Sequence, residues 1–167
     1  MLLLAAAAVS CSSTGSVSSK NAHKTTVQAP SIYPDWFNRQ NDFQADSLNF
    51  NAFATAIAAD STQSVHLAEK LARVHLEKGI DASLESLRVE AVKNQGRQSA
   101  YNKPSNIRAL RNAAESLQQM ASVEGVKTIK QASHYRSFVQ VSLRKQKAGS
   151  TVAQALPASI KDLAELL

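Results

Sequence analysis

The residue with the clearest chemistry in this sequence is Cys11, the only cysteine of the chain. It follows an apolar run, residues 1–10, that stops at the small residue Ser10. In bacteria, such a run followed by a cysteine marks an exported lipoprotein: the signal is removed before the cysteine, and the cysteine carries the lipid. The sequence therefore predicts a signal peptide over 1–10 and covalent lipid on Cys11.

Two features of this signal depart from the usual pattern. Ala8 stands where leucine is more common, and no Lys or Arg precedes the apolar run, although signal peptides normally begin with a positive region. The missing charge points to a start codon upstream of Met1 or to a clipped sequence. The alternative interpretation of Cys11 is a buried free thiol near a frayed terminus.

The anchor also predicts a location. Each buried methylene contributes about 0.8 kcal/mol, so several acyl chains hold a protein on a membrane essentially permanently. Ser12 follows the cysteine, in place of the aspartate that retains many lipoproteins at the inner membrane. We therefore expect outer-membrane attachment, facing the periplasm or the surface. Residues 11–30 are rich in Ser, Thr, Lys, Gln and Asn and predict a flexible tether.

The remaining reactive side chains form no catalytic or metal-binding pattern. His66 and His75 are nine residues apart on an expected helix, which separates them by about 13 Å along its axis at 1.5 Å per residue. There is no His-Glu-x-x-His motif, no glycine-rich phosphate loop and no Gly-x-Ser-x-Gly turn. We expect no enzyme, and no cofactor or metal besides the lipid.

Positive charge is concentrated in the second half of the chain. Between Arg88 and Lys147 there are 12 Lys or Arg against three acidic residues, a local net charge of +9. Because the chain is exported, we expect no nucleic acid and consider an anionic glycan or lipid headgroup instead. The alternative is a solvated face that aids solubility. The expected anion contacts are Arg97, Lys103, Arg108, Arg111, Lys127 and Lys130.

Three aromatic residues, Tyr33, Trp36 and Phe37, lie directly after the tether, and Pro34 keeps this segment extended. We expect them to dock on the side of the domain, with contact to a partner as the alternative.

The hydrophobic pattern then predicts the elements. Phe53, Thr55 and Ile57 alternate with alanines up to Ala59, which is typical of a strand closely approached by a helix. Asp60 or Ser61 is the expected N-cap of a long helix that ends near Gly96. Its apolar stripe is Val65, Ala68, Ala72, Leu76, Ile80, Leu84, Leu87 and Ala91. Gly79 lies within this stripe, where a bend would cost little.

A second helix is expected after Ser105, with Ile107, Leu110, Ala114, Leu117 and Ala121 as its buried face. Residues 126–129 and 135–143 then predict two strands, the second half-exposed, with Phe138 as the one apolar residue on its polar side. A short amphipathic helix follows Pro157.

The expected fold is α+β: a small antiparallel or mixed three-stranded sheet with two main helices on one face, in the order β-α-α-β-β, plus a short C-terminal helix. The domains are expected at 1–10 (signal peptide), 11–30 (tether), 31–147 (one α+β domain) and 148–167 (tail).

Three segments of this chain resemble the LPP-twenty family of small bacterial surface lipoproteins. Pro34-Asp35-Trp36 looks like the family's entry to its domain, Ala54–Asp60 followed by Ala68–Arg73 looks like its strand running into an alanine-rich helix, and residues 126–129 with 137–143 look like its closing strands. The chain lacks the glycines often found in the family's first strand. The resemblance implies no catalysis; some similar proteins assemble around the flagellar motor, and others are surface antigens.

These observations together predict a non-enzymatic, membrane-anchored envelope lipoprotein that acts as an assembly or interaction module, with copies of itself or an envelope protein or glycan as partner. The alternative is a periplasmic binding module for an anionic glycan or lipid headgroup.

Overall fold

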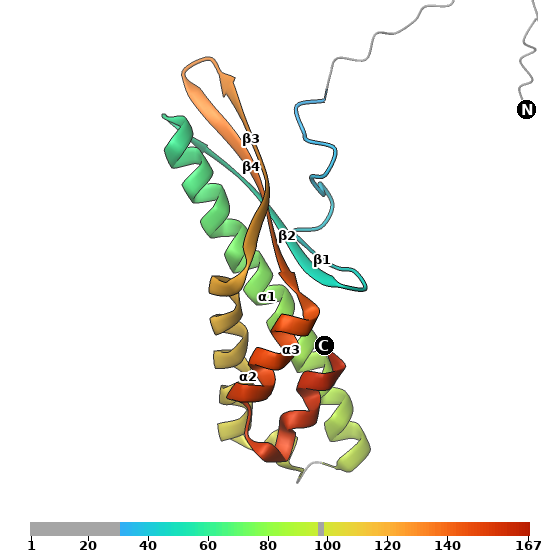
Figure 1. Cartoon of the computed structure of the whole chain (residues 1–167). Coiled ribbons are helices and arrows are strands. Elements are labelled where there is room, and N and C mark those ends of the chain that lie inside the picture. Colours follow the sequence, from blue (N-terminus) through green and yellow to red (C-terminus); the bar gives the residue numbers. More distant parts are fainter. Residues whose placement is uncertain (1–30, 97–98) are drawn as a thin grey trace, which may run out of the picture. The chain divides into compact units, whose positions relative to one another are not determined.

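The computed structural model describes residues 31–96 and 99–167, and residues 31–167 form one compact unit. Four strands, three α-helices and three 3-10 helices are assigned in the described residues (Figure 1). In chain order they are β1 (Phe43–Ala45), β2 (Asn49–Ala58), α1 (Ser61–Gln95), η1 (Ala100–Asn102), α2 (Pro104–Leu117), η2 (Gln118–Met120), β3 (Ser122–Gln131), β4 (His134–Arg144), α3 (Lys145–Ala155) and η3 (Ala158–Leu166).

The sheet is antiparallel throughout, with strand order β1-β2-β4-β3. The α+β class and the β-α-α-β-β order are as predicted, but the expected count of three strands was wrong because β1 adds a fourth. β1 has only three residues and follows a polar loop, so no alternating pattern could reveal it. It pairs in register with Phe50, Asn51 and Ala52 of β2. Beyond Phe53, the outer side of β2 pairs with no strand in the described residues.

Helix α1 begins and ends where the sequence predicted. The Asp60 side chain accepts a hydrogen bond from the backbone N–H of Gln63 at 2.8 Å, and the helix ends at Gly96, whose φ of 89° suits glycine. The helix runs unbroken through Gly79. A Cβ at Gly79 would lie 2.2 Å from the Phe43 ring. The glycine therefore makes room for the Phe43 side chain of β1 and does not bend the helix.

The first half of α1 covers one face of the sheet. Alanines on both sides let the helix and the sheet approach closely, and larger side chains fill the flanks of the contact. The buried residues are Phe50, Ala52 and Ala54 on β2, Val139, Val141 and Leu143 on β4, and Ala68, Ala72 and Leu76 on α1.

The second half of α1 packs in a helical layer with α2, α3 and η3 (Figure 1). The prediction of two helices on one sheet face was wrong in this respect, because α2 packs mainly on α1 and α3. Pro104 occupies the first turn of α2, so Ser105 lies inside the helix and is not its cap. The boundary expected after Lys147 falls within α3, and Val152, Ile160 and Leu163 of the expected tail are fully buried in the core.

Candidate functional site

Two of the predicted site residues, Cys11 and Arg97, lie outside the described residues, as do the expected signal peptide and tether. None of the helices in 31–96 and 99–167 is long and apolar enough to span a membrane.

The aromatic residues Tyr33, Trp36 and Phe37 dock on the outer face of the sheet, opposite α1. We call residues 33–37 the aromatic strap. The Phe37 ring centroid lies 5.1 Å from that of Phe138 and 6.1 Å from that of Phe53, and Tyr33 lies 5.3 Å from Phe138. Phe138 is consequently fully buried although its neighbours on that side of β4 are polar. The strap explains the one apolar residue on the polar side of this strand.

Trp36 completes the docking of the strap. Its indole lies on Gly125 of β3, where a Cβ would be 2.9 Å from the ring. Trp36 and Phe37 are half-buried, and the Arg39 guanidinium stacks 4.6 Å from the Tyr33 ring centroid. The three predicted aromatic residues are therefore brought together on one face of the domain.

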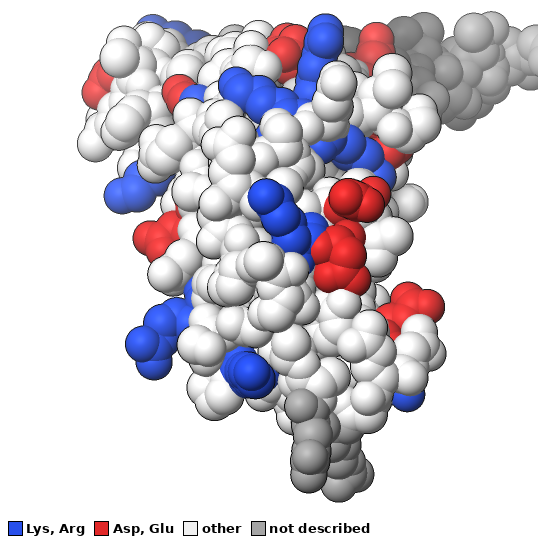
Figure 2. All heavy atoms as spheres, turned by 60° about the horizontal axis from the view of Figure 1, so that its bottom comes forward, with Lys and Arg blue, Asp and Glu red and all other residues white. Residues whose placement is uncertain are grey.

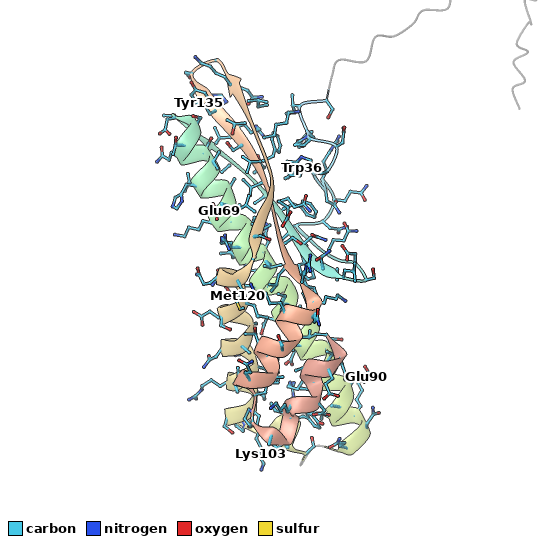
Figure 3. All side chains as sticks on the ribbon, in the orientation of Figure 1. Trp36, Glu69, Glu90, Lys103, Met120 and Tyr135 are labelled. Atoms are coloured by element: carbon cyan, nitrogen blue, oxygen red, sulfur yellow. The ribbon has the colours of Figure 1, made fainter. Side chains whose placement is uncertain are left out.

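The basic residues that the sequence grouped are separated in space. Lys103 lies at one end of the domain, and Lys130 lies near Tyr135 at the other, with its Nζ 5.8 Å from the Tyr135 ring (Figure 3). Arg108 and Arg111 are exposed on α2, whereas Lys127 is half-buried on β3. On the face drawn in Figure 2, acidic side chains lie between the basic ones. The structure therefore does not gather these residues into one anion site.

Titratable groups with shifted pKa values lie in structural contacts. Backbone N–H groups of Leu48 and Asn49 donate to Asp46 and lower its pKa. Arg88 donates to Glu85 and lowers the pKa of that carboxyl. Within the described parts of the chain, no three His, Cys, Asp or Glu side chains could hold a metal ion.

The pKa of buried Tyr101 is also shifted by a structural contact. The Tyr101 hydroxyl donates to Asp162 at 2.5 Å, and this bond raises the pKa of Tyr101. It joins η1 to η3 and so belongs to the helical layer.

The feature that most resembles an interaction site is the pair of unpaired strand edges. β3 forms one border of the sheet over ten residues, and Val123 and Val126 on it are 39% and 49% exposed. Their partners in register, Val141 and Val139, are buried under α1. The helix therefore covers β4 but leaves the same side of β3 open.

The opposite border of the sheet is open along the second half of β2. The backbone N–H of Phe53 donates to the backbone carbonyl of Asp42. The backbone carbonyl of Phe53 lies 2.8 Å from Nδ1 of His75 and accepts a hydrogen bond from it. Strand backbone groups alternate in direction, so those of Thr55 and Ile57 point to the same side, where no strand pairs in the described residues. Ile57 is 48% exposed.

Two leucines of α1, Leu67 and Leu71, continue this apolar border and are 41% and 40% exposed. They share a helix face with His75, because the three residues are four apart in sequence. In the part of the chain that the structure describes, five of the nine exposed large apolar side chains therefore border the two open edges. The outer edge of β2 is open over its second half because β1 is only three residues long, and no sequence pattern revealed β1.

Comparison with known proteins adds no relative: no protein-family model, no curated protein and no solved structure matches this chain.

Proposed function

We propose that this protein is a non-enzymatic lipoprotein of the bacterial outer membrane, anchored through Cys11, whose domain acts as an assembly module. The observation that carries the proposal is the pair of open strand edges with exposed apolar side chains on each. Unpaired edges are templates for another strand, and exposed apolar surface beside them favours association. The sequence pattern at Cys11 supports the anchor.

A second copy of the chain is the partner that both edges suit. β2 and β3 lie on opposite borders and run in the same direction, because each is antiparallel to β4. The β3 edge of one copy can therefore continue the sheet at the β2 edge of the next, with Val123 and Val126 against Leu67 and Leu71. Such a head-to-tail contact uses two different surfaces and is repeated from copy to copy.

Self-association is tested on residues 31–167 by sedimentation over a wide concentration range. We expect concentration-dependent oligomers, and we expect Val126→Lys or Ile57→Lys to weaken them roughly tenfold or more, because an interface core does not readily accept a charge. Val89→Lys is the matched control, since Val89 is 37% exposed on α1 and borders neither edge. A strictly monomeric domain, with no partner crosslinked in cells, would refute the proposal.

The resemblance to LPP-twenty lipoproteins belongs to the same proposal. The segments that carry it correspond to the strap, to β2 with the start of α1, and to the β3–β4 hairpin. On that resemblance we propose that the protein takes part in a flagellar or other envelope assembly.

Anion binding by the basic residues is the weaker alternative, because Lys103 and Lys130 lie at opposite ends of the domain. It predicts affinity for acidic lipid or glycan that falls with salt. Affinity that does not change between low and high salt would exclude it.

A further inference from the structure

An apolar hollow lies where β1, the second half of α1 and the end of the chain meet. Its volume is about 510 Å³, within the usual range of small-molecule sites, and it is open to solvent. Phe43, Phe50, Leu87 and Leu166 form its walls, together with Leu167, the last residue of the sequence. The Phe43 and Phe50 rings stack with centroids 5.9 Å apart and give it one rigid side.

Four small residues of α1 make the floor of this hollow: Gly79, Ala82, Ser83 and Ser86. Their spacing of three and four residues places them on one helix face. The Ser83 hydroxyl donates to the carbonyl of Gly79 at 2.9 Å, so it is satisfied within the helix and does not need water. The floor therefore carries only small side chains, with the Ser83 hydroxyl bonded inside the helix and the Ser86 hydroxyl exposed.

One cationic side chain, Lys145, lies at the rim. Its backbone N–H donates to the carbonyl of Leu48 at 2.8 Å, which fixes its position at the start of α3. Its Nζ lies 5.0 Å from the Phe50 ring centroid, and no carboxylate of the described residues lies within ion-pair distance of it. Lys145 also lines two adjoining hollows.

We propose that this hollow binds a long-chain fatty acid, with the acyl chain along the floor and the carboxylate at Lys145. An apolar surface bordered by Lys145, which has no ion-pair partner among the described residues, is complementary to an anionic amphiphile in both shape and charge. The site is distinct from the strand edges and does not depend on them. It gives the domain a lipid contact separate from the lipid expected on Cys11.

The test uses the full chain with Cys11→Ala, so that no attached lipid competes, and calorimetric titration with fatty acids of 8 to 14 carbons below their micelle concentrations. Burying a methylene contributes about 0.8 kcal/mol, so we expect affinity to rise by up to about fourfold per methylene. Alkyl trimethylammonium and alkyl maltoside of equal chain length serve as cationic and neutral probes and should bind more weakly.

Two substitutions with matched controls locate the site. Ala82→Trp fills the floor from an exposed helix position and should abolish binding, whereas Ala155→Trp, also at an exposed position, should not. Lys145→Met keeps the apolar stem and should weaken binding about two- to fivefold, the range of an exposed ion pair, whereas Lys147→Met should leave it unchanged. Circular dichroism checks that each variant is folded.

Equal affinity for the three headgroups would overturn the proposal. Binding that survives Ala82→Trp, or that Ala155→Trp removes equally, would overturn it as well. Because these outcomes do not involve oligomerisation, they are independent of the assembly proposal.

Discussion

At the scale of single residues, buried hydroxyl groups tie the sheet to α1. Ser137 of β4 is fully buried, and its Oγ lies 2.6 Å from Oγ of Ser64 on α1 and 2.7 Å from Oγ1 of Thr128 on β3. This chain of hydroxyls joins the two strands of the β3–β4 hairpin to α1, which is distant from them in sequence. It also fixes the register, since a slip of one residue would bury Phe138 or Arg136 under the helix.

Removing this hydroxyl is therefore expected to destabilise the domain. Ser137→Ala should lower the free energy of unfolding by about 1–2 kcal/mol, because two hydrogen bonds are lost in a buried place. Urea denaturation measures the change. Ser133→Ala, at an exposed position in the β3–β4 turn, should change it by less than about 0.5 kcal/mol. Equal effects of the two substitutions would contradict this role.

Tyr101 makes stability depend on alkaline pH. The bond to Asp162 raises its pKa above the ordinary 10.0, so the folded state holds the proton more tightly than the unfolded state. The stabilisation is complete below the ordinary pKa and is lost as the pH rises through the raised value. We expect Tyr101→Phe to cost about 1 kcal/mol at neutral pH and the difference from the wild type to shrink above pH 10. A difference that stays constant with pH, in denaturation series from pH 7 to 11, would be inconsistent with this bond.

At the scale of elements, the aromatic strap is a separate layer on the sheet. The strap covers the sheet face opposite α1 at Phe138. Around this residue β4 is therefore buried on both faces, by the strap on one and by α1 on the other. Because the strap directly follows the expected tether, we expect it to be the first part of the domain on which a force from the proposed anchor would act.

Undocking the strap should be visible in fluorescence. Phe37→Ala removes the ring between Phe53 and Phe138, and we expect a loss of about 2–3 kcal/mol in unfolding free energy, below the range for a fully buried Phe. Trp36 is the only tryptophan, so its emission reports this region alone. We expect a red shift as the indole leaves Gly125 and meets water. Unchanged emission would show that the strap is held without Phe37.

Gly79 links α1 to β1 and the apolar hollow. Gly79→Ala should improve helix propensity by about 1 kcal/mol, but the new Cβ would overlap Phe43. We expect net destabilisation in the single variant and recovery when Phe43→Ala is added. A double-mutant cycle by thermal denaturation measures the coupling. Additive effects would mean that β1 moves away freely.

At the scale of the whole molecule, attachment and folding are expected to be independent. Residues 31–167 form their own compact unit, and Cys11 lies 20 positions before it. Cys11→Ala should therefore leave the melting temperature of the domain unchanged while the protein moves from the membrane fraction to the soluble fraction. Cell fractionation with metabolic palmitate labelling measures both. Retention in the membrane fraction without label would refute the lipid anchor.

Local sequence pattern was sufficient for the longer elements of the fold. The four-residue stripe from Ala68 to Leu84 predicted α1 and its buried face, and alternation predicted the inner part of β2 and most of β4. These signals are reliable because each element has enough residues to repeat its own period. α3 was missed because Lys145–Ala155 carries Gly149 and only one large apolar residue, Val152, and its burial depends on η3 and α2.

The sequence by itself determined the α+β class, the caps of α1 and the predicted lipid site at Cys11, because each depends on residues close together in the chain. Only the tertiary structure decided that Phe138 contacts the strap, that Gly79 contacts Phe43, and that the edge of β2 away from β4 is unpaired over half its length. These contacts join segments far apart in sequence, and their energies depend on which surfaces the topology brings together. The open edge of β2 likewise depends on where the short β1 stops, and the hollow at Lys145 depends on how residues 166–167 pack beside β1 and α1.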